Sequence, residues 1–113
     1  MPYSMKYEFT TTDDFDKEFK SLRKKYKTLN NDLKKLMSAI ENGKDGGIDL
    51  GGGFKKIRMK ITAKNKGKSG GARVITYETI VNIEKMLVSF VSIYDKSEYE
   101  NIDIDILKDN LGV

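Results

Sequence analysis

Apolar side chains near the start of the chain recur at the spacing of helix faces. An alternating segment, Met5–Phe9, predicts a short strand, and two amphipathic helices are expected over residues 13–26 and 29–41. Thr11 or Thr12 supplies the N-cap of the first helix. Only a few residues separate the two helices, so we expect them to pack as an antiparallel hairpin. The apolar stripes comprise Phe15, Phe19, Leu22 and Tyr26, then Leu29, Leu33, Leu36, Met37 and Ile40.

After the helices, apolar and polar residues alternate strictly, or apolar residues form short runs. The elements predicted there are an irregular glycine-rich segment over 44–53, strands over 54–62, 72–77 and 85–94, a mobile hairpin loop over 63–71, and a short helix over 103–111. The order β-α-α-β-β-β with a short C-terminal helix indicates an α+β fold. In this fold the N-terminal helical hairpin packs on a small curled antiparallel β-sheet. The sequence contains no linker or repeat, and we expect a single domain over residues 1–113.

The composition of the chain argues against several classes of function. There is no histidine, which removes the commonest general base near neutral pH and any Ser–His or Cys–His pair. There is no cysteine, which removes disulfides and zinc sites of the cysteine type. The N-terminus lacks the apolar core of a signal peptide, and no apolar run is long enough to span a bilayer. We therefore expect a cytoplasmic protein without membrane contact.

Two segments that resemble ligand-binding motifs do not have the required spacing. Gly67-Lys68-Ser69 looks like the end of a phosphate-binding P-loop, but Thr62 stands where the first glycine belongs, and a strand follows instead of a helix. The acidic cluster over residues 13–18 lacks the spacing and glycine of a calcium loop and is interpreted as a helix start. We expect no metal and no small-molecule cofactor.

Positive charge is concentrated in the predicted strand over residues 54–62. The net charge of the chain is +4, yet residues 54–73 contain no acidic side chain at all. The alternation places Lys56, Arg58 and Lys60 on one face of the strand, opposite the apolar residues. Exposed cations aligned at strand spacing are typical of a surface that binds the phosphates of a nucleic acid.

The neighbouring strand adds Arg73 to this predicted surface. Same-face residues of adjacent antiparallel strands lie close together, and arginine can bind a phosphate through two hydrogen bonds. We expect Arg73 to be an exposed strand charge, and lysines of the loop, Lys68 among them, to reach phosphate. Other cations of the run are interpreted as solvated, and they are Lys55, Lys64 and Lys66.

Three segments together resemble the RelE/HigB-like toxins of bacterial type II toxin–antitoxin modules, which belong to the RelE/ParE superfamily. The segments are Lys56-Ile57-Arg58, the run GKSGGARVI from Gly67 to Ile75, and the run SIYDKSE from Ser92 to Glu98. The order of helices and strands is also similar, so the resemblance extends through almost the whole chain. It implies a metal-independent endoribonuclease that enters the ribosomal A site, cleaves mRNA and thereby inhibits translation. It also implies a cognate antitoxin protein as partner.

The resemblance also implies roles for individual residues. In this chemistry the ribose 2′-hydroxyl attacks the adjacent phosphodiester, and fixed cations must meet the charge that grows on the phosphate. Arg73 matches the strand arginine that stabilises this charge, whereas the basic strand with Lys56, Arg58 and Lys60 matches the one that holds RNA.

The end of the last strand corresponds to the catalytic edge of these toxins. Tyr94 is expected there as a stacking or proton-handling residue, and Lys96 as a phosphate-contacting or acid residue. Lys96 and Ser97 stand where some members of the family have a second arginine. The identity of the general base is therefore left open by the sequence.

Two other functions stay open beside the nuclease. A ParE-like toxin shares this fold and poisons DNA gyrase by binding, without enzymatic activity. A decayed toxin would be a plain RNA- or DNA-binding module. The basic strand favours the nuclease, because a gyrase-binding protein does not need a cradle for phosphates.

Overall fold

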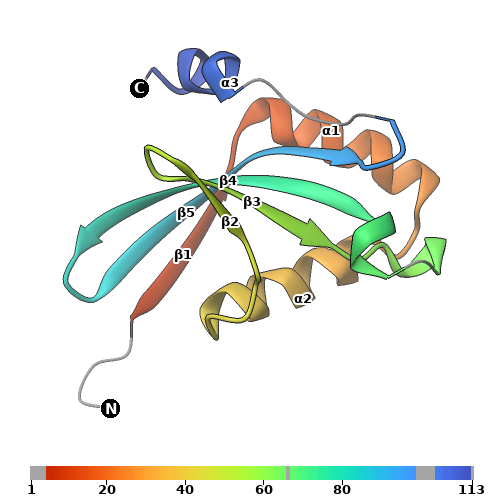
Figure 1. The fold of residues 1–113 in the computed structure, drawn as a ribbon, viewed down its shortest axis with the longest axis horizontal. Helices are drawn as coiled ribbons and strands as arrows, with labels where there is room; N and C mark the ends of the chain where they lie inside the picture. The colour runs from red at the N-terminus through yellow and green to blue at the C-terminus, as the bar shows by residue number, and fades with distance from the viewer. Residues whose placement is uncertain (1–4, 66, 99–103, 113) are drawn as a thin grey trace.

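The computed structural model describes residues 5–65, 67–98 and 104–112, which form one sheet, three α-helices and two 3-10 turns (Figure 1). The predicted α+β class and the N-terminal helical hairpin are confirmed. In chain order the elements are β1 (Lys6–Thr11), α1 (Asp13–Lys25), α2 (Leu29–Glu41), β2 (Ile48–Gly51), β3 (Phe54–Met59), the 3-10 turns η1 (Thr62–Lys64) and η2 (Lys68–Gly70), β4 (Ala72–Asn82), β5 (Lys85–Asp95) and α3 (Ile104–Leu111).

The helix bounds follow closely from local sequence. α2 begins and ends where the apolar stripe predicted, and α1 ends one residue earlier than expected. Of the two candidate N-caps of α1, Thr12 is the one used, and its Oγ1 accepts a hydrogen bond from the backbone N–H of Phe15 at 3.1 Å. The acidic first turn of α1 and the basic last turn both complement the helix dipole.

The sheet has five strands in the order β1-β5-β4-β3-β2 and is mixed, whereas the sequence predicted an antiparallel sheet. β2 through β5 are antiparallel neighbours, but β1 runs parallel to β5. Only antiparallel neighbours can be joined by a tight turn, and the chain reaches β5 long after it leaves β1. No local sequence signal therefore determines whether β1 and β5 run parallel or antiparallel. Phe9 of β1 stacks on Phe90 of β5, with 5.7 Å between ring centroids.

The strand bounds differ from the prediction by one or two residues in β1 and β5 and by more in β3 and β4, and one strand was not predicted. β2 lies within the segment that was expected to be irregular, and it pairs with β3 through a two-residue turn at Gly52 and Gly53, both at positive φ. A Gly-Gly pair suits such a hairpin turn because glycine adopts this conformation without strain. β3 ends at Met59, before the 3-10 turn η1, and β4 continues to Asn82. The expected C-terminal helix forms as α3, although residue 103 lies outside the described residues.

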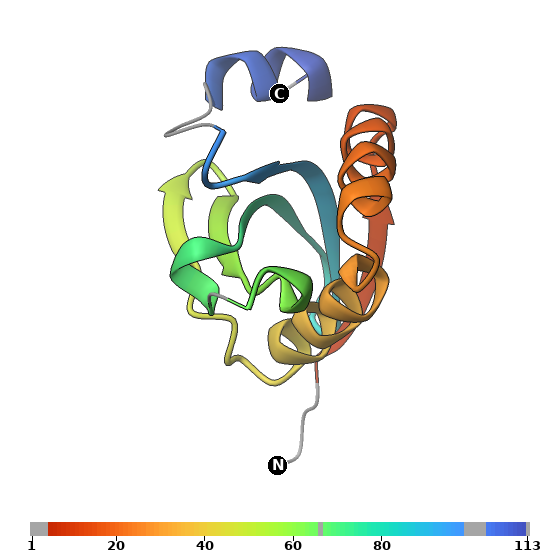
Figure 2. The ribbon, with the colours of Figure 1, turned by 90° about the vertical axis from the view of Figure 1, so that its right-hand side faces the viewer.

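Apolar side chains fill both faces of the curled sheet. The larger cluster lies between the sheet and the two N-terminal helices, and it includes Phe15, Leu36 and Ile57. A second, smaller cluster lies on the opposite face, where Leu107 of α3 packs near Tyr94. Figure 2 shows α1 and α2 along one side of the sheet and α3 across another. Among helices of the described residues, none is long and apolar enough to cross a bilayer.

Candidate nucleic-acid interface

Three predicted site residues form one row across the sheet. Arg58 of β3 lies opposite Arg73 of β4, and Arg73 in turn lies opposite Tyr94 of β5. Residues directly opposite on antiparallel strands share a face, so the three side chains lie side by side. We call these residues the cross-strand row. The row brings together side chains that are up to 36 residues apart in the sequence.

The row contains two like charges with no carboxylate to offset them. Arg58 and Arg73 face each other directly, which is unfavourable in a sheet. Within residues 5–65, 67–98 and 104–112, neither guanidinium lies in an ion pair. Burial lowers the pKa of Arg73 from its ordinary value, and the nearby charge of Arg58 lowers it further. The protein thus keeps a repulsive pair where a neutral pair would be more stable.

Arg73 is buried, contrary to the expectation of an exposed strand charge. Only 6% of the residue is accessible to solvent. Its guanidinium Nη1 donates to the carbonyl oxygens of Lys68 and Ala72, each at 3.3 Å, and Nη2 donates to that of Ser69 at 3.2 Å. The loop between β3 and β4 folds back onto β4 and covers the side chain. Arg73 therefore holds the loop, whereas Arg58 remains exposed.

Tyr94 is also buried, with 4% of the residue accessible. Its ring belongs to the smaller apolar cluster, with Phe54, Ile75 and Leu107. Burial raises the pKa of Tyr94, and the positive charge of Arg73 acts in the opposite direction. In this conformation the ring therefore presents little surface on which a base could stack.

The remaining predicted residues lie on or next to the strands of the row, and two of them, Lys60 and Lys68, line a pocket against α2. Lys56 lies on the same face, at the position opposite Ile75, and is half-buried. Lys60 follows the end of β3 and is exposed, as are Lys68 in η2 and Lys96 after β5. The backbone N–H of Lys96 donates to the carbonyl oxygen of Gly71 at 3.1 Å, which places Lys96 beside the loop.

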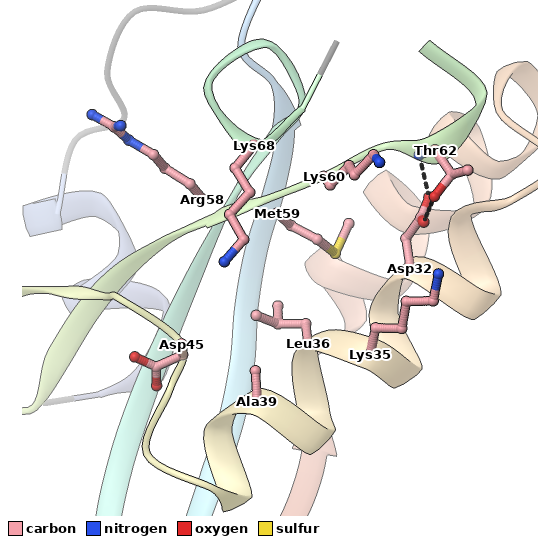
Figure 3. Close-up of a pocket in the computed structure, with 10 residues that line it drawn as sticks. All are labelled: Asp32, Lys35, Leu36, Ala39, Asp45, Arg58, Met59, Lys60, Thr62 and Lys68. Atoms are coloured by element: carbon pink, nitrogen blue, oxygen red, sulfur yellow. Dashed lines mark hydrogen bonds between the residues drawn. The ribbon is translucent and has the colours of Figure 1, made fainter. Parts of the chain in front are cut away.

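The loop from residue 60 to residue 71 is tied to the body of the protein, whereas the sequence predicted a mobile hairpin loop. Asp32 of α2, which is 3% exposed, accepts hydrogen bonds from the backbone N–H and the Oγ1 of Thr62, at 3.0 and 2.6 Å (Figure 3). Oγ1 of Thr28 donates to the same carboxylate at 3.0 Å and accepts from the backbone N–H of Ala63. At the other end, a Cβ on Gly71 would collide with the carbonyl oxygen of Met59, so this position requires glycine.

A buried ion pair fixes the middle of the loop. Asp95, which is fully buried, accepts a hydrogen bond from Nζ of Lys64 at 2.8 Å, and its other carboxylate oxygen accepts one from the hydroxyl of Tyr26 at 2.7 Å. The backbone N–H and the hydroxyl of Ser97 also donate to Asp95. Burial would raise the pKa of Asp95, but the hydrogen bonds from Lys64, Ser97 and Tyr26 outweigh it and hold the pKa far below the ordinary value.

This network was not predicted from the sequence. Lys64 was expected to be solvated, yet the Lys64 side chain is only 11% exposed and paired with Asp95. Lys55 is likewise not simply solvated, because it forms ion pairs with Glu78 and Asp45 at 3.1 and 3.7 Å. Lys66 lies outside the described residues. The one local signal was the Asp-x-Ser spacing after β5, which is typical of a turn closed by an aspartate side chain.

A carboxylate of α1 supports the strand that carries Tyr94. Oε1 of Glu18 accepts a hydrogen bond from the backbone N–H of Ile93 at 3.2 Å. β1 ends opposite Phe90, so this N–H lies beyond the point where β1 pairs with β5. Burial raises the pKa of Glu18. Within the described residues, no group of three or more acidic side chains is placed to hold a metal ion, although Glu100 and Asp103 of the acidic tail lie outside them.

Comparison with models of protein families gives a match. A family model described as the RelE toxin of the RelE/RelB toxin–antitoxin system matches residues 15–110. The matched region includes α1 except for its first two residues, all of α2, the whole cross-strand row and the loop. A search of curated proteins finds no significant match.

Proposed function

The chain belongs to the RelE toxin family, and from this premise we propose that it is the toxin of a toxin–antitoxin module. Its activity is that of a metal-independent endoribonuclease, which acts in the cytoplasm on mRNA in the ribosomal A site and so stops translation. Its partners are the ribosome with its mRNA, and a cognate antitoxin that blocks it. The single observation that best supports this proposal is the cross-strand row, where two arginines face each other without a carboxylate between them.

Electrostatics explains why such a row suits phosphodiester cleavage. The 2′-hydroxyl oxygen bonds to phosphorus, its proton leaves, and the bond to the 5′ oxygen breaks as that oxygen gains a proton. Negative charge grows on the phosphate oxygens during this step, and cations that are already in place stabilise it without reorganisation. The repulsion between Arg58 and Arg73 is relieved when a phosphate binds. A site whose two arginines repel each other when no phosphate is bound therefore favours the negatively charged transition state.

Burial divides the roles within the row. Arg58 is exposed and is the guanidinium that contacts the phosphate, with Lys56 on β3, Lys60 just after β3 and Lys68 from the loop. Arg73, buried beside it, adds its charge and keeps the loop in place through the carbonyl oxygens of Lys68 and Ser69. Lys96, exposed at the end of β5, is the candidate proton donor to the departing 5′ oxygen. Tyr94 handles a proton rather than stacking on a base.

The proposal is tested by inducing the protein in bacteria and mapping the 5′ ends of cellular mRNA. The wild-type chain should arrest growth and produce new ends at fixed positions within codons. Arg58→Ala should abolish both effects. Arg23→Ala is the matched control, because Arg23 is an exposed arginine of α1 outside the row, and it should remain toxic. Growth arrest with intact transcripts and damaged DNA would overturn the nuclease in favour of a gyrase poison.

A further inference from the structure

β5 contains a β-bulge within its pairing with β4. Ile75 of β4 lies opposite Ser92, but the next residue of β4, Thr76, lies opposite Phe90. Val91 is therefore an extra residue in β5. A bulge of this kind shifts the alternation of side chains along its strand, and bulges often lie next to active sites, where they redirect a side chain. This bulge precedes the end of β5 that contributes to the cross-strand row.

The bulge decides which face of the sheet each later side chain of β5 occupies. Before it, Val88 and Phe90 lie in the larger apolar cluster, against the N-terminal helices. After it, Ile93 lies in that cluster, whereas Tyr94 lies in the smaller cluster on the opposite face. Uninterrupted alternation from Phe90 would turn Tyr94 toward the helices and away from Arg73. The cross-strand row therefore depends on the extra residue.

The outer edge of β5 changes partner at the bulge. β1 pairs with β5 as far as Phe90, and the backbone N–H of Thr12 donates to the carbonyl oxygen of Phe90 at 3.1 Å. At the bulge itself, Oγ1 of Thr12 donates to the carbonyl oxygen of Val91 at 3.4 Å. Beyond this point, α1 takes the place of a strand beside β5 (Figure 1).

Glu18 is the residue of α1 that binds this edge of β5 after the bulge. Its Oε1 accepts a hydrogen bond from the backbone N–H of Ile93 at 3.2 Å, and its Oε2 accepts one from Oγ of Ser92 at 3.4 Å. Both residues of β5 are buried, so removal of Glu18 would leave a buried N–H without this acceptor. The two hydrogen bonds hold consecutive residues of β5 immediately before Tyr94.

We propose that Glu18 is a positioning residue for the cleavage reaction, because its hydrogen bonds to β5 keep the bulge at Val91 and thereby keep Tyr94 beside Arg73. α1 packs on the face of the sheet opposite Tyr94, so Glu18 acts through β5 rather than on RNA. Its role in catalysis rests on the proposed function. An amide oxygen accepts the same hydrogen bonds as a carboxylate, so the reach of the side chain should matter more than its charge.

Three substitutions separate reach from charge in a single-turnover assay of mRNA cleavage on stalled ribosomes. Glu18→Gln keeps the length of the side chain without its charge, Glu18→Asp keeps the charge on a shorter side chain, and Glu18→Ala removes both. At saturating protein, Glu18→Gln should cleave within about twofold of the wild-type rate, whereas Glu18→Asp and Glu18→Ala should be slower by about tenfold or more. The protein concentration that gives half the maximal rate should not change, because the cations that bind RNA are intact. Asp16→Ala is the matched control, since Asp16 is an exposed carboxylate of the same helix, and it should cleave like the wild type.

A second measurement reports the register of β5 without any RNA. NMR of the labelled protein should show cross-strand NOEs between the backbones of Tyr94 and Arg73 in the wild type and in Glu18→Gln. In Glu18→Asp and Glu18→Ala these NOEs should weaken, and loss of the bulge would replace them with NOEs between Ile93 and Arg73.

Unchanged NOEs in Glu18→Ala would overturn the inference, and so would a Glu18→Gln variant as slow as Glu18→Ala. If Glu18→Ala does not fold, the comparison of Glu18→Asp with Glu18→Gln decides the question. A wild-type chain that cuts no mRNA would refute the nuclease, whereas the NOEs would still decide whether Glu18 keeps Tyr94 beside Arg73.

Discussion

Two regions of the molecule use the same kind of residue in opposite ways. In the cross-strand row, Arg58 is exposed and faces another cation, with no carboxylate partner among the described residues. In the loop, Lys64 is half-buried and ion-paired with Asp95, whose carboxylate also accepts hydrogen bonds from Tyr26 and Ser97. Both cations come from the same basic stretch of sequence. The difference shows that burial and partner, rather than charge alone, separate a cation that stabilises the fold from one that is available to a ligand.

Removal of the loop cation is expected to have the largest effect on stability. Lys64→Met leaves Asp95 fully buried without its counter-ion, and removal of one partner of a buried pair costs about 3 kcal/mol or more. Urea denaturation of the purified protein measures the loss. Lys60→Met is the matched control, because Lys60 is exposed, and a surface substitution of this kind changes stability by less than about 0.5 kcal/mol. Equal losses for the two variants would contradict the comparison.

Arg73→Ala is expected to have an intermediate effect on stability and a large effect on activity. The substitution leaves the carbonyl oxygens of Lys68, Ala72 and Ser69 without this donor, which costs about 1–3 kcal/mol. The sequence alone had suggested an exposed arginine, and an exposed charge contributes little to stability. Urea denaturation should therefore show reduced stability, and mRNA cleavage should also be impaired. A variant that unfolds like the wild type would show that the loop does not depend on this side chain.

A pH series tests how much the buried carboxylate of Asp95 contributes to the stability of the loop region. The folded protein holds the pKa of Asp95 below its unfolded value of about 3.9, so the unfolded state binds more protons between the two values. The stability that Asp95 contributes is present above about pH 4 and is lost as the pH falls below it. The free energy of unfolding should thus decline from pH 5 toward pH 3. Asp95→Asn should flatten that decline, and an unchanged slope would rule out Asp95 as its source.

The smallest expected effect on stability belongs to Arg58. Arg58→Ala removes an exposed cation that repels Arg73, so the free energy of unfolding should stay the same or rise by up to about 0.5 kcal/mol. The same variant should lose mRNA cleavage. Side-by-side denaturation and cleavage assays of one protein preparation measure both. A marked loss of stability would show that Arg58 belongs to the fold rather than to the site.

Local patterns in the sequence were enough to predict the helices and most strands. The stripe from Leu29 to Ile40 and the Thr12 cap are signals that lie within a few residues of the structure they specify. The hairpin of β2 and β3 had such a signal as well, in Gly52 and Gly53, although it was interpreted as irregular structure. The parallel placement of β1 had none, because it depends on a neighbour far along the chain.

The part of the candidate site that follows from the alternation of side chains along strands could be predicted from the sequence. Alternation placed Arg58 on the polar face of its strand, and pairing with the next strand brought Arg73 beside it. It could not show that the loop would bury Arg73. The partnership of Lys64 with Asp95 spans 31 positions, and that of Tyr26 with Asp95 spans 69. No spacing rule connects side chains so far apart, so the distinction between the two regions appears only in the folded protein.

The most direct test of the account uses purified ribosomes stalled with a defined codon in the A site. The wild-type protein should cut the mRNA within that codon and should leave the same mRNA intact when ribosomes are absent. Arg58→Ala, at unchanged stability, should leave the codon uncut. Cleavage by Arg58→Ala at the wild-type rate would contradict the claim that the cross-strand row carries out the reaction.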